Sequence, residues 1–203
     1  RRSALLGGCR GGLFVGRRAG GQLCLEAGDP VLQVGQLLDP TNGLALSGFG
    51  GTGTVGATTV TQGVISAGTL TSPTGVLNLA NGVTFTPNGT YLCKIAGATP
   101  GANGHDQLNV TGAVNLANAR LAPLPWNGYV PVMGDEYRII NNDGSDPVVG
   151  TFVGAPEGAI FAGALNTAFR ISYLGGDGND VTIKRVPRAQ FDFDADGMTD
   201  ISV

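Results

Sequence analysis

Between Pro40 and Cys93 the chain contains no charged residue, and this feature most limits the structures that it can form. Gly, Thr, Asn and Ser fill the interval, together with short runs of Val, Leu and Ile. A surface helix normally places an apolar stripe opposite a charged face, and no window of the sequence pairs the two. The interval therefore favours strands that pair through their backbones, and it offers few groups for acid–base catalysis.

The composition of the whole chain supports a packed fold made of short elements. Among 203 residues there are 35 Gly and 11 Pro, about twice the usual share. Charged residues make up 13%, about half the usual proportion, and the net charge of −3 gives no basic surface for nucleic acid. A hydrophobic content of 42% is too high for a disordered chain. No apolar run approaches the ~20 residues that a membrane-spanning helix needs.

Short runs rich in Val, Ile, Thr and aromatic residues recur from residue 47 onward, separated by Gly, Asn-Gly and Pro, as expected for strands and turns. The expected strands of the first half include Thr58–Val60, Val64–Ile65, Val76–Leu79, Val83–Thr86, Tyr91–Ile95, Leu108–Val110 and Val114–Leu116. In the second half we expect strands at Tyr137–Ile140 and Val148–Val153, and a hairpin that joins Phe169–Tyr173 to Val181–Lys184.

An internal repeat suggests how these strands are arranged. Thr74–Asn81 (TGVLNLAN) recurs as Thr111–Asn118 (TGAVNLAN), 37 residues further on (111 − 74). Stacked coils of a solenoid bring equivalent residues together, and Asn suits their corners because its side chain can form ladders. We therefore predict an all-β fold, a right-handed parallel β-helix that ends in an antiparallel hairpin. An antiparallel β-sandwich uses the same residues and is the alternative.

Several blocks resemble the autotransporter-associated β-strand repeat family over about residues 48–185. These blocks are Gly50–Gly56, Asp106–Gly112, Ile139–Asp146, Gly150–Phe152, Pro156–Ala159 and Ile171–Val181. The resemblance implies a β-helical segment of a large exported or surface-displayed bacterial protein, generally without catalytic residues. It does not cover residues 1–46, which we expect to be a poorly defined leader or partial coil, and residues 186–190 are expected to be a linker.

The final residues, 191–203, carry a separate motif with metal-ligand spacing. Asp192, Asp194 and Asp196 alternate, Gly197 permits a sharp bend, and the carbonyl of Met198 and the carboxylate of Asp200 complete an oxygen-rich loop. Hard oxygen ligands of this kind select Ca²⁺. The flanking residues alternate as strands, which differs from an EF-hand, and the segment resembles the first loop of an FG-GAP/VCBS-type repeat. We predict a Ca²⁺ site here, weak in a chain that holds only the first loop.

Other residues whose side chains could react or bind ligands are expected to have ordinary structural roles. His105, the one histidine, is expected to be solvated in a turn beside Asp106, and Asp135, Glu136, Asp143 and Asp146 are expected at turns. Packing is favoured over a sugar-stacking platform for the three aromatic residues Trp126, Tyr129 and Tyr137. The loop Gly175–Asp180 resembles one copy of the calcium-binding nonapeptide of RTX toxins, and a Gly-rich hairpin turn is favoured there. Cys9, Cys24 and Cys93 show no metal spacing, and no disulfide pairing follows from them.

These observations favour a non-catalytic structural or adhesive segment of a secreted or cell-surface bacterial protein. Its ligands would be surface polysaccharides or proteins, and its expected cofactor is Ca²⁺ in the C-terminal loop. Two alternatives remain. One is a carbohydrate-binding β-sandwich, and the other is a β-helical polysaccharide lyase or hydrolase, which would need a pair of carboxylates at a suitable separation.

Overall fold

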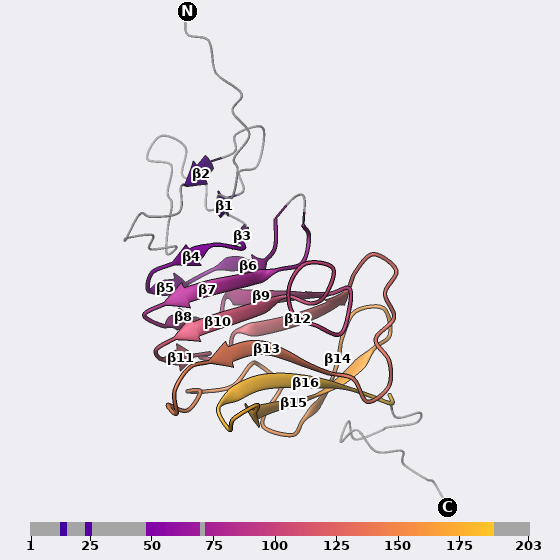
Figure 1. The fold of residues 1–203 in the computed structure, drawn as a ribbon. Helices are drawn as coiled ribbons and strands as arrows, with labels where there is room; N and C mark the ends of the chain where they lie inside the picture. The colour runs from indigo at the N-terminus through magenta and orange to yellow at the C-terminus, as the bar shows by residue number, and fades with distance from the viewer. Residues whose placement is uncertain (1–12, 16–22, 26–47, 70–71, 189–203) are drawn as a thin grey trace, which may run out of the picture.

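The computed structural model describes residues 13–15, 23–25, 48–69 and 72–188. These residues form strands and turns with no helix among them, which confirms the predicted all-β class. Three sheets make up the body (Figure 1). No helix able to cross a membrane occurs within these described ranges.

The first sheet, called sheet A here, has the strand order β12-β9-β6-β3-β1-β2. Its strands are β1 (Leu13–Val15), β2 (Leu23–Leu25), β3 (Gly48–Gly51), β6 (Gly63–Ala67), β9 (Gly89–Ile95) and β12 (Arg120–Pro125). The pairs from β3 to β12 are parallel, whereas β1 pairs antiparallel with both β2 and β3.

Sheet B has the order β14-β15-β16-β13-β10-β7-β4, and sheet C has the order β11-β8-β5. Sheet B contains β4 (Thr54–Val55), β7 (Val76–Ala80), β10 (Gln107–Thr111), β13 (Glu136–Asn142), β14 (Ile160–Ala162), β15 (Ala168–Gly175) and β16 (Asp180–Val186). Sheet C contains β5 (Thr58–Val60), β8 (Val83–Phe85) and β11 (Val114–Asn115). From β4 to β13, and throughout sheet C, neighbouring strands are parallel, so a wholly antiparallel sandwich does not describe this body.

The chain visits sheets A, B and C in the same order each time. We call one such passage a layer: β3–β5 form the first, β6–β8 the second and β9–β11 the third. The fourth layer has β12 and β13, followed by an isolated parallel bridge from Val149 to Asn115 of β11. Figure 1 shows the layers stacked from β4 and β5 down to β13.

Stacking in register builds the core from side chains that point between the sheets. Leu77 of β7 pairs with Leu108 of β10, which pairs with Ile140 of β13, and all three side chains are buried. Val83 of β8 pairs with Val114 of β11 in the same way. Burying a Leu, Val or Ile side chain stabilises the fold by about 1.5–3 kcal/mol, so each repeated position adds to one continuous core.

The spacing of the layers differs from the predicted 37-residue repeat. Asn78 pairs with Asn109, 31 residues further on (109 − 78), and not with Asn115. The two similar segments occupy different places: the first contains β7 of sheet B, whereas the second runs from the last residue of β10 through β11 of sheet C. Their likeness reflects the same alternation of buried and outward residues, which any strand on this core must follow.

Turns repeat with the layers as well. Gly82 and Gly112 both have positive φ, 89° and 92°, and the N–H of Gly82 donates a 2.7 Å hydrogen bond to the carbonyl of Thr111. A Cβ on Gly82 would lie 2.7 Å from the carbonyl oxygen of Ala113. Stacked turns this close leave no room for a side chain, which explains glycine at this corner.

At its C-terminal end the body changes from parallel to antiparallel strand pairing. β13 pairs antiparallel with β16, which pairs antiparallel with β15, so the predicted Gly-rich hairpin is confirmed. β12 is the last strand of sheet A and contains Pro123 and Pro125. Proline lacks the N–H that would pair with a further strand, and it is therefore suited to a sheet edge. These residues help to end the parallel stacking.

One expected strand did not form. Residues 148–153 form no continuous strand, although their backbone makes the bridge of Val149, a bridge between Phe152 and Ala155, and hydrogen bonds with residues 114–119. Tyr173 of β15 takes part in this irregular segment: its hydroxyl accepts a 2.8 Å bond from the N–H of Phe152 and donates a 2.6 Å bond to the carbonyl of Ala155. The hydroxyl of Tyr173 thus adds to the backbone hydrogen bonds that join this segment to residues 114–119.

Candidate functional site: a buried lysine–aspartate cluster

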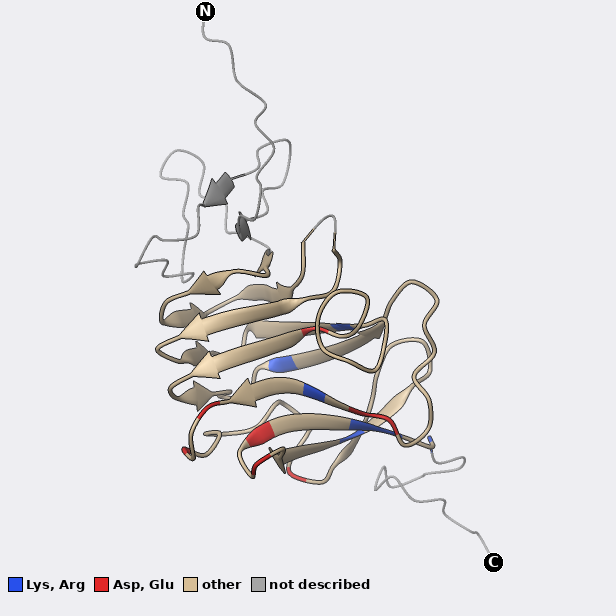
Figure 2. Cartoon of the chain, viewed as in Figure 1, with Lys and Arg blue, Asp and Glu red and all other residues tan. Residues whose placement is uncertain are grey.

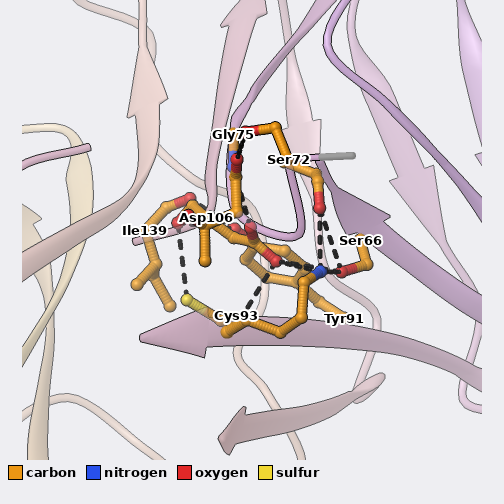
Figure 3. Close-up of polar contacts among 10 residues, drawn as sticks. Ser66, Ser72, Gly75, Tyr91, Cys93, Asp106 and Ile139 are labelled. Carbon is orange, nitrogen blue, oxygen red and sulfur yellow. Dashed lines mark hydrogen bonds and ion pairs between the residues drawn. The ribbon is translucent and has the colours of Figure 1, made fainter. Parts of the chain in front are cut away.

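The first charged residue after the uncharged interval, Lys94, is buried beside Asp106. Figure 3 shows Asp106 with its neighbours Ser66, Gly75 and Cys93. Lys94 lies near the end of β9, and Asp106 directly precedes β10. The connecting loop closes on itself, since the N–H of Asp106 donates to the carbonyl of Lys94 at 2.8 Å. In return the N–H of Lys94 donates to Oδ2 of Asp106 at 3.1 Å. Backbone pairing therefore brings the two side chains together.

Lys94 has an acceptor for each of its three ammonium hydrogens. Its Nζ lies 2.6 Å from Oδ2 of Asp106 and 2.8 Å from the carbonyl oxygen of Ala67, and it also contacts Oγ of Ser66. The side chains of Lys94 and Asp106 are 11% and 0% exposed. An ammonium can remain charged away from water when its donors are satisfied in this way.

Asp106 is equally well supplied with donors. Ser66 donates its hydroxyl to Oδ2 at 2.9 Å, and the N–H of Gly75 donates to Oδ1 at 3.1 Å. Ser66 and Gly75 belong to the second layer, whereas Lys94 and Asp106 belong to the third. The cluster consequently ties two layers together where the chain passes from sheet A to sheet B. Burial raises the pKa of Asp106, and the charge and hydrogen bonds of Lys94 oppose this shift.

Two further polar side chains approach the backbone of Asp106. Tyr91 directs its hydroxyl to the carbonyl of Ile139 at 2.9 Å and to that of Asp106 at 3.3 Å. The Sγ of Cys93 lies 3.4 Å from the same carbonyl of Asp106. Burial raises the pKa of both the Tyr91 hydroxyl and the Cys93 thiol. Cys93 is a free thiol that stays protonated, and it is therefore a poor nucleophile.

The expectation that His105 is solvated in a turn is wrong. His105 is 2% exposed, its Nε2 lies 3.3 Å from the carbonyl oxygen of Arg138, and its ring meets that of Tyr137 edge-on with centroids 5.3 Å apart. Burial lowers the pKa of His105. Polar and Gly-rich neighbours suggested a surface loop, but the loop folds back so that its last two residues enter the body.

The other acidic residues do not gather into one site. Asp135 precedes β13 and Asp143 follows it, and a strand of this length separates them by about 25 Å. The carboxylate of Asp135 is contacted by Tyr129 and Tyr137, while Asp143 accepts a 2.6 Å bond from the N–H of Gly112. Glu136 and Asp146 are exposed.

The three aromatic residues considered for sugar stacking are not equally accessible. Tyr137 is fully buried, Tyr129 is partly buried and Trp126 is 39% exposed. Packing, which the sequence favoured, is therefore confirmed for Tyr137.

Side-chain hydrogen bonds and an ion pair connect the predicted Gly-rich turn at the end of β15 to β13 and to the turn that follows it. Asp180 is fully buried, with Oδ2 3.0 Å from Nη1 of Arg138 and Oδ1 accepting a 2.8 Å bond from the N–H of Asn142. Nδ2 of Asn179 lies 3.0–3.3 Å from the carbonyl oxygens of Asp143, Gly144 and Asp146. These contacts join the hairpin loop to the turn after β13.

The predicted calcium ligands Asp192, Asp194, Asp196, Met198 and Asp200 lie outside the described residues. Within the part of the chain that the structure describes, no group of three His, Cys, Asp or Glu residues is placed to hold a metal ion. Cys9 also lies outside this part. The Ca²⁺ loop therefore stays a prediction.

Sequence reasoning missed the roles of Lys94, Ser66 and Asp106. One signal was available, because an uncharged interval ends at Lys94 and a single acidic residue, Asp106, follows within the same layer. Figure 2 shows the result: the upper layers are free of charge, and charged residues begin with the third layer.

Comparison with protein-family models found no model that matches the chain. Comparisons with curated proteins and with solved structures found no match either.

Proposed function

We propose that this chain is a non-catalytic structural or adhesive segment of an exported or cell-surface bacterial protein. The observation that carries the proposal is the repeated parallel pairing, in register, of three strand positions through successive layers. Such stacking builds a stiff body from short strands and needs no charged groups in the first two layers. The buried charges of Lys94 and Asp106 in the third layer and of Asp180 in β16 are each paired within the body.

We also propose that the body is a right-handed parallel β-helix that ends in the antiparallel hairpin of β15 and β16. Support comes from the constant order in which the chain visits the three sheets. Connections between parallel strands of one sheet are right-handed in nearly all proteins, which favours this hand. Surface polysaccharides or proteins are the proposed ligands.

The C-terminal loop of residues 192–200 is proposed to bind Ca²⁺ through its alternating aspartates. Calcium titration of the purified chain should show weak, saturable binding, and Asp194→Ala should abolish it. Identical titration curves for the two proteins would refute the metal site without bearing on the β-helical body.

Surface display can be tested in the source cells. Antibody raised against the purified chain should label intact cells, and brief treatment of those cells with a protease should remove the label. A cytoplasmic marker protein, examined in the same cells, controls for leakage. Labelling that appears only after the cells are lysed would contradict the proposal. Release of new reducing ends from a panel of polysaccharides by the purified chain would contradict the non-catalytic assignment.

A further inference from the structure

The atoms of Lys94 and Asp106 are placed for a reaction as well as for an ion pair. Nζ of Lys94 lies 2.6 Å from Oδ2 of Asp106, and Cγ is one bond beyond that oxygen. Both side chains are held by several hydrogen bonds and are shielded from water. Holding two reacting groups in this way raises their effective concentration by orders of magnitude over a reaction between free molecules.

A change of protonation state makes the pair reactive. Transfer of one proton from Nζ to Oδ2, across the contact already present, gives a neutral amine and a neutral carboxylic acid. Loss of water around the pair disfavours the charged forms relative to this neutral pair. The raised pKa of Asp106, caused by its burial, acts in the same direction.

Residues beside the pair supply the other groups that a condensation between amine and carboxylic acid needs. When the nitrogen of Lys94 attacks Cγ, negative charge develops on Oδ1, which accepts the N–H of Gly75 at 3.1 Å. The hydroxyl of Ser66 contacts both Nζ and Oδ2, so it can pass the second proton from nitrogen to the leaving oxygen. One C–N bond forms, one C–O bond breaks, and Oδ2 leaves as water. The reaction requires no further reactant.

We propose that Lys94 and Asp106 condense into an intramolecular amide. The bond would close a covalent ring around the loop between β9 and β10, and it would fix the corner that ties the second layer to the third. A crosslink of this kind suits a stiff body exposed to proteases or mechanical load. The inference concerns the cluster alone, and its outcome is independent of where the protein is located in the cell.

Mass spectrometry of the purified full chain tests the proposal. The intact protein should be lighter than its sequence mass by one water molecule after prolonged incubation at neutral pH. Trypsin cleaves after free lysine, so the denatured wild-type chain should resist cleavage after Lys94 and yield one peptide that spans residues 19–120. Fragmentation of this peptide should give no separated backbone fragments between residues 94 and 106, because the amide closes that stretch into a ring.

The control must distinguish the amide from other losses of water. An aspartate followed by glycine, such as Asp177, can lose water by forming a cyclic imide with its own backbone. Lys94→Arg keeps the positive charge and removes the amine, so this variant should show the full sequence mass. A full-mass wild-type chain that trypsin cuts after Lys94 would overturn the proposal, and so would a loss of water that persists in Lys94→Arg. Neither wild-type measurement depends on whether the variant folds.

Discussion

Replacing Lys94 by Met should destabilise the protein strongly, because the change isolates a buried carboxylate. Methionine has nearly the same length as the lysine stem and fills its space. It cannot replace the contacts that Nζ makes to Asp106, Ala67 and Ser66. Removing one member of a buried ion pair typically costs 3–5 kcal/mol, and this is a large part of the 5–15 kcal/mol that holds a typical domain folded.

The measurement is urea unfolding, followed by circular dichroism and by the fluorescence of the single Trp126. Lys184→Met is the matched control, since Lys184 is the only other lysine and is exposed. We expect the control to change the free energy of unfolding by no more than about 0.5 kcal/mol. An amide between Lys94 and Asp106 would enlarge the difference between wild type and Lys94→Met, because it also constrains the unfolded chain.

A double-mutant cycle separates the pair from its surroundings. Adding Asp106→Asn to Lys94→Met removes the isolated charge, so the double variant should lose less stability than the two single variants together. A loss below about 1 kcal/mol for Lys94→Met, comparable to that of a surface pair, would show that water reaches the cluster. The argument from burial would then be refuted.

Three further predictions concern other polar groups that are buried or partly buried. Burial lowers the pKa of His105, so the unfolded chain binds more protons than the folded chain. The free energy of unfolding should therefore fall as the pH drops below about 6.5, by at most about 1.4 kcal/mol per pH unit. Urea titrations from pH 7 to 5 should show this slope in wild type and not in His105→Gln. Tyr173→Phe leaves the buried N–H of Phe152 unpaired and should cost about 1–3 kcal/mol by thermal or urea unfolding; an unchanged midpoint would contradict the assigned bond. Asn109→Asp removes the amide that donates to Asn78 and should lower the free energy of unfolding by about 1 kcal/mol in the same assay. An unchanged free energy of unfolding would show that the hydrogen bond between Asn109 and Asn78 does not stabilise the fold.

The sequence predicted the local structure of the body well. Val, Leu and Ile alternating with polar residues identified β7, β8 and β10, and the Gly-rich segment between Phe169–Tyr173 and Val181–Lys184 correctly indicated a hairpin. Strand propensity and alternation depend on neighbouring residues, so they can be recognised without knowledge of the fold.

The register of the layers could not be found in this way. Residues on sheets B and C follow the same in-and-out alternation, so Thr74–Asn81 and Thr111–Asn118 match each other although their equivalent residues do not pair. The segment Val148–Val153, which resembles a strand, is irregular, and it is held by backbone hydrogen bonds to residues 114–119 and by the hydroxyl of Tyr173. Both outcomes depend on contacts between distant parts of the chain.

The sequence alone determined that this protein is built from strands, because it supplies β-prone residues and almost no material for an amphipathic helix. Only the tertiary structure decided that Lys94, Asp106 and His105 are buried. A charged residue can enter a core when donors and acceptors from other layers meet it, and Ser66, Ala67 and Gly75 do so only after the chain has stacked. Composition reports what each residue prefers in water, whereas burial depends on the partners that folding brings to it.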